Sequence, residues 1–241
     1  MRGSGAGTTM SRISSRRGRD APRMVLLAIA ALLVALAAMR AWIESRRTSE
    51  LEGWAVSSGY RFEHRSADPL PGEVADIGIL HMGRSPRYTN IVTGSMGGMQ
   101  FEALDYGFSF RWGRGGRLQT AVLFHDSVRS WPTFVVFPRN VAAGNRAAPP
   151  AGGGTFLGDV ESNPFFTNRY LLRDHDDPAL AHVLRSFLLG PGRTWGWRIE
   201  GQNHWLVVCR NDSRVPAGKM DELLVEVAAV ADSLAGVAAR P

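Results

Sequence analysis

The longest apolar stretch of the chain is Met24-Val-Leu-Leu-Ala-Ile-Ala-Ala-Leu-Leu-Val-Ala-Leu-Ala-Ala-Met39, sixteen residues without a polar side chain. At about 1.5 Å per helical residue it reaches only ~24 Å, short of the ~30 Å hydrocarbon core of a bilayer. The following Arg40-Ala41-Trp42-Ile43 supplies the missing length. An arginine can extend its charge to the headgroups, and tryptophan favours the interface. We therefore predict a transmembrane helix over residues 24–43.

A cleaved secretory signal is the main alternative, because a basic segment precedes the stretch and Ala35-Leu36-Ala37 offers a small-residue cleavage site. Such spacing arises often in an alanine-rich helix, and residues 41–43 lengthen the stretch beyond what a signal requires. A soluble amphipathic helix is excluded because residues 24–39 have no polar face. We favour an uncleaved anchor, hence a single-pass protein of the cell membrane with the lipid bilayer as a partner.

The side of the membrane that the domain faces depends on where translation starts. Counting arginines before and after the span places the N-terminal tail in the cytoplasm and the domain outside. If Met24 is the true start, the preceding arginines are lost. Arg40, Arg46 and Arg47 would then hold the domain in the cytoplasm, so both sides stay open.

The segments that flank the apolar stretch differ in character. Residues 1–23 are rich in Gly, Ser and Arg and have little to bury, so we predict a disordered basic tail. Residues 44–59 predict a juxtamembrane helix, with Ser49 able to cap it and Gly59 able to end it. Its apolar face is formed by Leu51, Trp54 and Ala55.

Residues 60–241 predict a globular domain of the α+β class, an antiparallel β-sheet with packed helices. Strands are predicted at residues 60–64, 88–93, 99–112, 118–125, 133–137, 165–172, 195–200 and 205–210, and helices at 178–189 and 216–235. The four strands from residue 88 to residue 137 are expected to form a meander, with hairpin turns at residues 94–98 and 201–204. The continuous apolar run of residues 205–209 predicts a central strand covered on both faces. Residues 141–154 predict a flexible loop.

The charge of the chain is concentrated near the apolar stretch. Residues 1–47 hold nine arginines against Asp20 and Glu44, a net charge of +7. The whole chain carries +6, so residues 48–241 carry −1. We therefore expect no nucleic acid partner, and we expect a soluble 48–241 fragment to show no salt-dependent binding to DNA or RNA.

No motif in the sequence assigns a catalytic, cofactor-binding or metal site. Gly94-Ser95-Met96-Gly97 departs from a nucleophile elbow, because the first glycine is one residue too close and strands flank it on both sides. The acidic run of residues 174–177 could bind a cation, but it also suits the start of a helix at Pro178. The single cysteine, Cys209, reads as a buried apolar residue. No ligand spacing relates His64, His81, His125, His182 and His204.

Arg84, Arg87 and Tyr88 form the most prominent polar and aromatic cluster, which could meet lipid headgroups but is favoured as a solvated loop. Four tryptophans could equally be buried or exposed: Trp131, Trp195, Trp197 and Trp205.

Several short motifs resemble an uncharacterised bacterial family of single-pass membrane-anchored proteins of unknown function. They are Trp54-Ala55-Val-Ser-Ser-Gly59-Tyr-Arg-Phe62, Gly83-Arg84-Ser85 with Asn90 and Gly94, and Asp105-Tyr106. The resemblance covers about residues 25–235 and implies a membrane anchor and a similar domain. The family has no assigned activity, so it implies no catalytic residue.

The sequence favours a non-enzymatic module that binds a protein or envelope partner. The alternative is a membrane-tethered enzyme, such as a hydrolase, whose site is gathered only in the fold. A deep pocket lined by Asp174, Asp176 and a histidine would favour the enzyme.

Overall fold

The computed structural model describes residues 17–65, 77–81, 84–109, 117–128, 130–138, 170–173, 178–189, 197–210 and 213–238. The chain divides into two compact units, Met1–Arg46 and Arg47–Pro241, which are treated separately below. Two predicted features lie wholly outside the described residues, the loop at 141–154 and the acidic run at 174–177. Parts of others do so as well: residues 1–16 of the tail, 110–112 of the strand at 99–112, 165–169 of the strand at 165–172, and 195–196 of the strand at 195–200.

Helix α1 (Arg17–Ser57) is continuous and contains the whole apolar stretch, whose side chains from Met24 to Met39 are exposed. Among the described residues it supplies the one helix that is long and apolar enough to cross a membrane. It begins at Arg17, inside the segment predicted as a disordered tail, and continues past Ser49, so the expected span and the juxtamembrane helix are parts of one helix. The helix is uninterrupted at Ser49 because residues 23–52 contain neither glycine nor proline, and most of them are good helix formers.

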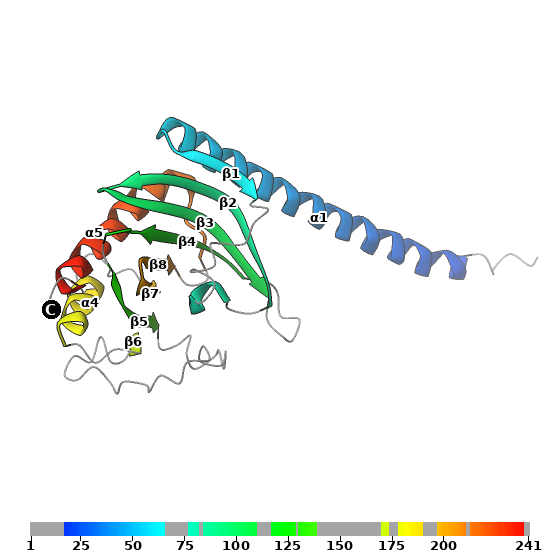
Figure 1. Cartoon of the computed structure of the whole chain (residues 1–241). Helices are drawn as coiled ribbons and strands as arrows, with labels where there is room; N and C mark the ends of the chain where they lie inside the picture. Colours follow the sequence, from blue (N-terminus) through cyan, green and yellow to red (C-terminus); the bar gives the residue numbers. More distant parts are fainter. Residues whose placement is uncertain are drawn as a thin grey trace, which may run out of the picture. The chain divides into compact units, whose positions relative to one another are not determined.

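The second unit contains an eight-stranded antiparallel sheet with the strand order β1-β2-β3-β4-β8-β7-β5-β6 (Figure 1). Its strands are β1 (Arg61–Arg65), β2 (Arg84–Met96), β3 (Met99–Ser109), β4 (Arg117–His125), β5 (Trp131–Pro138), β6 (Tyr170–Arg173), β7 (Trp197–Asn203) and β8 (Trp205–Arg210). Strands β1 to β4 form a meander, but β5, predicted as its last strand, lies between β7 and β6 instead. Strands β8 and β7 lie between β4 and β5, so the apolar run of β8 is in the interior of the sheet.

Two hairpins are tighter than predicted. Gly97 and Gly98 alone form the β2–β3 turn, with φ angles of 60° and 82°, while Ser95 pairs with Gln100 in the ladder. Two successive left-handed residues are what a two-residue turn requires, and glycine adopts them at no steric cost. In the β7–β8 hairpin Gln202 pairs with Trp205, so the turn consists of the two residues between them.

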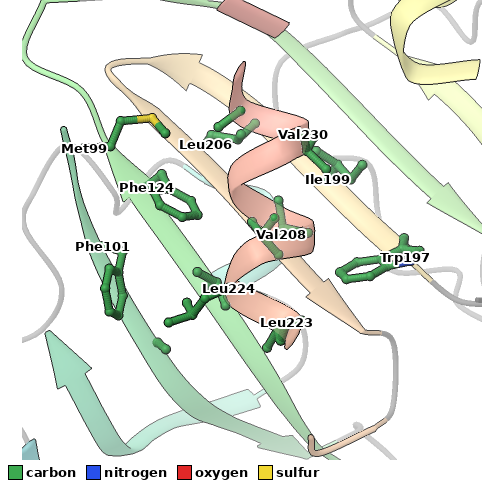
Figure 2. Close-up of a cluster of buried hydrophobic side chains, with 14 of the residues drawn as sticks. Met99, Phe101, Phe124, Trp197, Ile199, Leu206, Val208, Leu223, Leu224 and Val230 are labelled. Atoms are coloured by element: carbon green, nitrogen blue, oxygen red, sulfur yellow. The ribbon is translucent and has the colours of Figure 1, made fainter. Parts of the chain in front are cut away.

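Helices α4 (Pro178–Leu189) and α5 (Met220–Ala238) contact each other and lie on one face of the sheet (Figure 1). Strand β8 directs Leu206 and Val208 to this face, where they join Phe124 and Leu224 in the larger hydrophobic core (Figure 2). Helix α5 begins later than predicted because Ala217–Lys219 forms a 3-10 turn first.

The opposite face of the sheet carries a second core. Trp205, Val207 and Cys209 of β8 belong to it, so the central strand is buried on both faces, as predicted. The short helix η2 (Gly78–His81) packs against this core through Leu80. The Gly78 N–H donates to Glu200 Oε1 at 2.6 Å, which connects η2 to β7.

Candidate functional site

Asp105 on β3 is a charged residue on a buried face, with 2% of its surface exposed. Alternation along β3 points Phe101, Ala103 and Asp105 toward the larger core. Arg47 meets this carboxylate with two parallel hydrogen bonds, Nε to Oδ2 and Nη2 to Oδ1, each 2.7 Å long. This bidentate arrangement is the strong form of the arginine–carboxylate pair.

The remaining acceptor sites of the Asp105 carboxylate are also used. Asn90 Nδ2 donates to Oδ2 at 3.0 Å, and Thr120 Oγ1 donates to Oδ1 at 3.3 Å. The Thr120 oxygen in turn accepts the Val215 N–H at 2.9 Å, and Arg47 Nη1 donates to the Val215 carbonyl at 2.8 Å. The cluster therefore joins α1, β2, β3, β4 and the segment before α5 around one carboxylate.

Asn90 holds an unusual backbone conformation within this cluster, with a φ of 53° at an irregularity between Thr89 and Val92 in the β2–β3 ladder. Asparagine tolerates the left-handed region better than most residues. Its Oδ1 accepts the Thr48 hydroxyl at 2.9 Å, and His64 Nδ1 lies 3.3 Å from the same oxygen. The bulge thus turns the Asn90 side chain toward both α1 and Asp105.

This network has the chemistry of a structural connection. A carboxylate that accepts two arginine bonds, an amide and a hydroxyl has its lone pairs engaged, and a buried charge requires such partners. Arg47 is only 11% exposed. The cluster fixes the part of α1 from Arg47 to Ser57 on the sheet, and Leu51 and Ala55 of that segment are buried in the core.

The sequence motifs weighed for catalysis occupy structural positions. Gly94 lies in β2, where an added Cβ would come within 2.5 Å of the Tyr60 ring, so a glycine is needed for packing. Cys209 is buried, and burial raises the pKa of its thiol to about 12, so the reactive thiolate is scarce at neutral pH. Among the described residues no group of three His, Cys, Asp or Glu side chains has metal-binding geometry.

The cluster predicted as a loop, Arg84, Arg87 and Tyr88, lies on β2, so the loop interpretation is wrong. Tyr88 stacks on Tyr106 with ring centres 5.5 Å apart and donates its hydroxyl to the Leu80 carbonyl at 3.0 Å. Burial raises the pKa of the Tyr88 hydroxyl. Three of the four tryptophans are buried, Trp131, Trp197 and Trp205; Trp195 lies outside the described residues.

The histidines are dispersed. His64 belongs to the Asn90 cluster, whereas His125 and His204 lie at the other end of the sheet, with ring centres 6.2 Å apart. His182 is exposed on α4, and the side chain of His81 is outside the description. Glu102 is the half-buried carboxyl in β3, where burial and then the nearby Glu63 raise its pKa.

Sequence reasoning missed the role of Arg47, which it counted only as a charge flanking the span. The available signal was Asp105, because an ionised residue that alternates onto a buried strand face needs a cation or several donors. Asn90 and Asp105 both belong to the motifs that carry the family resemblance, and the structure brings their side chains into contact.

Comparison with known proteins supports the fold. No protein-family model matches the sequence, and no curated protein matches it. A similar solved structure is the crystal structure of the mycobacterial trehalose monomycolate transport factor A, TtfA. It aligns with a TM-score of 0.52 and 16% identity over 78% of this chain and 94% of that chain. At this identity the likeness shows a shared α+β fold.

Proposed function

We propose that this chain is a single-pass membrane protein whose domain binds a protein or another envelope component at the bilayer surface. The observation that carries the proposal is the position of Arg47. This residue lies four positions after Ile43, the end of the expected span, and is already built into the sheet through Asp105. Four helical residues extend only ~6 Å, so the chain between the expected span and the domain is short.

The structural neighbour supports an envelope-related role, since that protein is a trehalose monomycolate transport factor. The buried polar cluster serves as a structural connection, because each of its groups is engaged in holding α1 on the sheet. Photo-crosslinking in cells tests the proposal with probes at three exposed valines, Val56, Val128 and Val225. We expect a discrete adduct from at least one position. Membrane-bound protein that forms no adduct from any of them would contradict a binding role.

The anchor is tested by fractionation. Full-length protein should sediment with membranes and resist a carbonate wash, because residues 24–39 expose an entirely apolar surface. A fragment of residues 44–241 should remain in the supernatant. Recovery of a mature chain that begins near Ala38 in the medium would establish a cleaved signal instead.

The side of the membrane is tested by cysteine labelling. Cys209 is buried and the pKa of its thiol is raised, so we expect it not to react with the labelling reagent. A new cysteine can therefore be introduced at Val128, which is 89% exposed. With the arginine-rich tail in the cytoplasm, we expect a membrane-impermeant maleimide to label Val128→Cys in cells with a permeable outer layer. The same reagent should spare Ser14→Cys until the membrane is broken. Labelling of Val128→Cys only after the membrane is broken would place the domain in the cytoplasm, as expected if Met24 is the start and the chain then lacks Ser14.

A further inference from the structure

The strand register gathers arginines at one end of the sheet. Arg65 pairs with Thr89, Thr89 with Asp105, and Asp105 with Thr120, so these residues form one row across β1 to β4. Five arginines lie either in this row or between it and the near ends of the strands. They are Arg65, Arg84, Arg87, Arg117 and Arg210. Among the described strand residues of that end the one carboxylate is Asp105, which Arg47 already neutralises.

The opposite end of the sheet has a different balance. The row that joins Arg61, Thr93 and Glu102 continues across the sheet to Glu200 and Arg173. From this row to the hairpin turns the described strands carry Arg61, Arg173, Glu102 and Glu200, and Asp126 follows just after β4. The −1 net charge of residues 48–241 therefore conceals a domain with one strongly basic end. Such an asymmetry acts on a charged surface within about a Debye length, ~8 Å at physiological salt.

The basic end is also the end at which the chain enters the domain. Arg47, the first residue of the domain, contacts Asp105 and Thr120 there. The same helix segment ends near the hairpin end, since the Tyr60 ring that follows it packs on Phe101 with centres 5.0 Å apart. Exposed Arg65 and Arg87 thus lie at the end of the sheet where Arg47 is bound.

We propose that this arginine end is a docking surface for the anionic headgroups of the bilayer in which the chain is anchored. The inference rests on the proposed membrane anchor. Phosphate oxygens match the guanidinium donors, and each arginine near an anionic membrane surface contributes about fivefold to binding. Arg65 and Arg87 together therefore favour anionic lipid roughly thirtyfold. Headgroup contact at this end limits tilting of the domain and presents its other faces to a partner.

The test measures lipid selectivity of the full chain. Protein in neutral detergent is mixed with equal amounts of phosphatidylglycerol and phosphatidylcholine, and native mass spectrometry counts the lipids retained. We expect the wild type to retain phosphatidylglycerol preferentially. Arg65→Gln with Arg87→Gln should lower this preference up to thirtyfold. Arg61→Gln is the matched control, since it removes an exposed arginine from the other end of the same strand, and it should change little.

Unchanged unfolding midpoints would show that the variants are folded, as expected for exposed side chains. Equal selectivity in the wild type and the double variant would overturn the proposal while the anchor stands. A chain that stays soluble without detergent would refute the anchor itself. Displacement of the retained lipid by soluble glycerol phosphate would also overturn the proposal, because the arginines would then bind a free phosphate.

Discussion

Replacing Asp105 by alanine is expected to lower the free energy of unfolding of the domain by about 3–5 kcal/mol, the usual cost of leaving a buried charge unpaired. Arg47, 11% exposed, would lose both of its bonds to the carboxylate. Asn90 and Thr120 would lose an acceptor as well. Since small domains are stable by only ~5–15 kcal/mol, this change removes a large fraction of the total. Denaturant unfolding followed by tryptophan fluorescence gives the measurement.

The matched control is the neighbouring arginine. Arg46→Met removes the same charge one residue earlier, where the guanidinium lies 5.8 Å from the centre of the Trp42 ring. It should leave the unfolding midpoint nearly unchanged, whereas Arg47→Met should lower it clearly. Combining Arg47→Met with Asp105→Leu should restore part of the loss, because the pair is then replaced by apolar groups. Equal effects of Arg46→Met and Arg47→Met would show that the ion pair is not structural.

Because Arg47 holds Asp105, the stability of a soluble fragment of the domain depends on whether the fragment includes Arg47. A fragment that starts at Thr48 keeps every strand but lacks Arg47, so it should unfold as readily as Arg47→Met. A fragment that starts at Glu44 retains the ion pair and should match the wild-type midpoint. The difference between the two fragments is a second measurement of the Arg47–Asp105 connection, independent of side-chain replacement.

Local patterns in the sequence predicted the parts of the fold that depend on neighbouring residues. Alternation placed Phe101, Ala103 and Asp105 on one face of β3, and the apolar run at Trp205 predicted a strand buried on both faces. The fold class, the last helix and its buried Leu224 were predicted for the same reason. Each of these features follows from periodicity within a single element.

Relations between distant segments could not be predicted in this way. The pairing of β4 with β8 joins Ala121 to Cys209, and nothing in either strand specifies that partner over β5. The Arg47–Asp105 pair spans 58 residues and depends on the Asn90 bulge and on the Val215 carbonyl. The positive-inside rule already explains an arginine next to an apolar span, so nothing in its own position indicated a structural role for Arg47.

Helix α5 is expected to be essential for folding, and Leu224 is the side chain that tests this most directly. It is 0% exposed and lies over Val208 and Phe124, the β8 and β4 side chains of the larger core (Figure 2). Truncating a buried leucine leaves a cavity in addition to the lost transfer free energy, so Leu224→Ala should cost about 2–5 kcal/mol. Ending the chain at Val215 should prevent cooperative folding, because it uncovers the whole face beneath the helix.

The control lies one residue further along the same helix. Val225 is 62% exposed, and alanine is the better helix former, so Val225→Ala should leave the unfolding midpoint unchanged or slightly higher. Comparing the two variants in the 44–241 fragment removes any general effect of substituting this helix. If the chain that ends at Val215 keeps a cooperative transition at the wild-type midpoint, α5 is peripheral. The core would then have to be held by the ion pair and the sheet alone, and Leu224→Ala would have no effect.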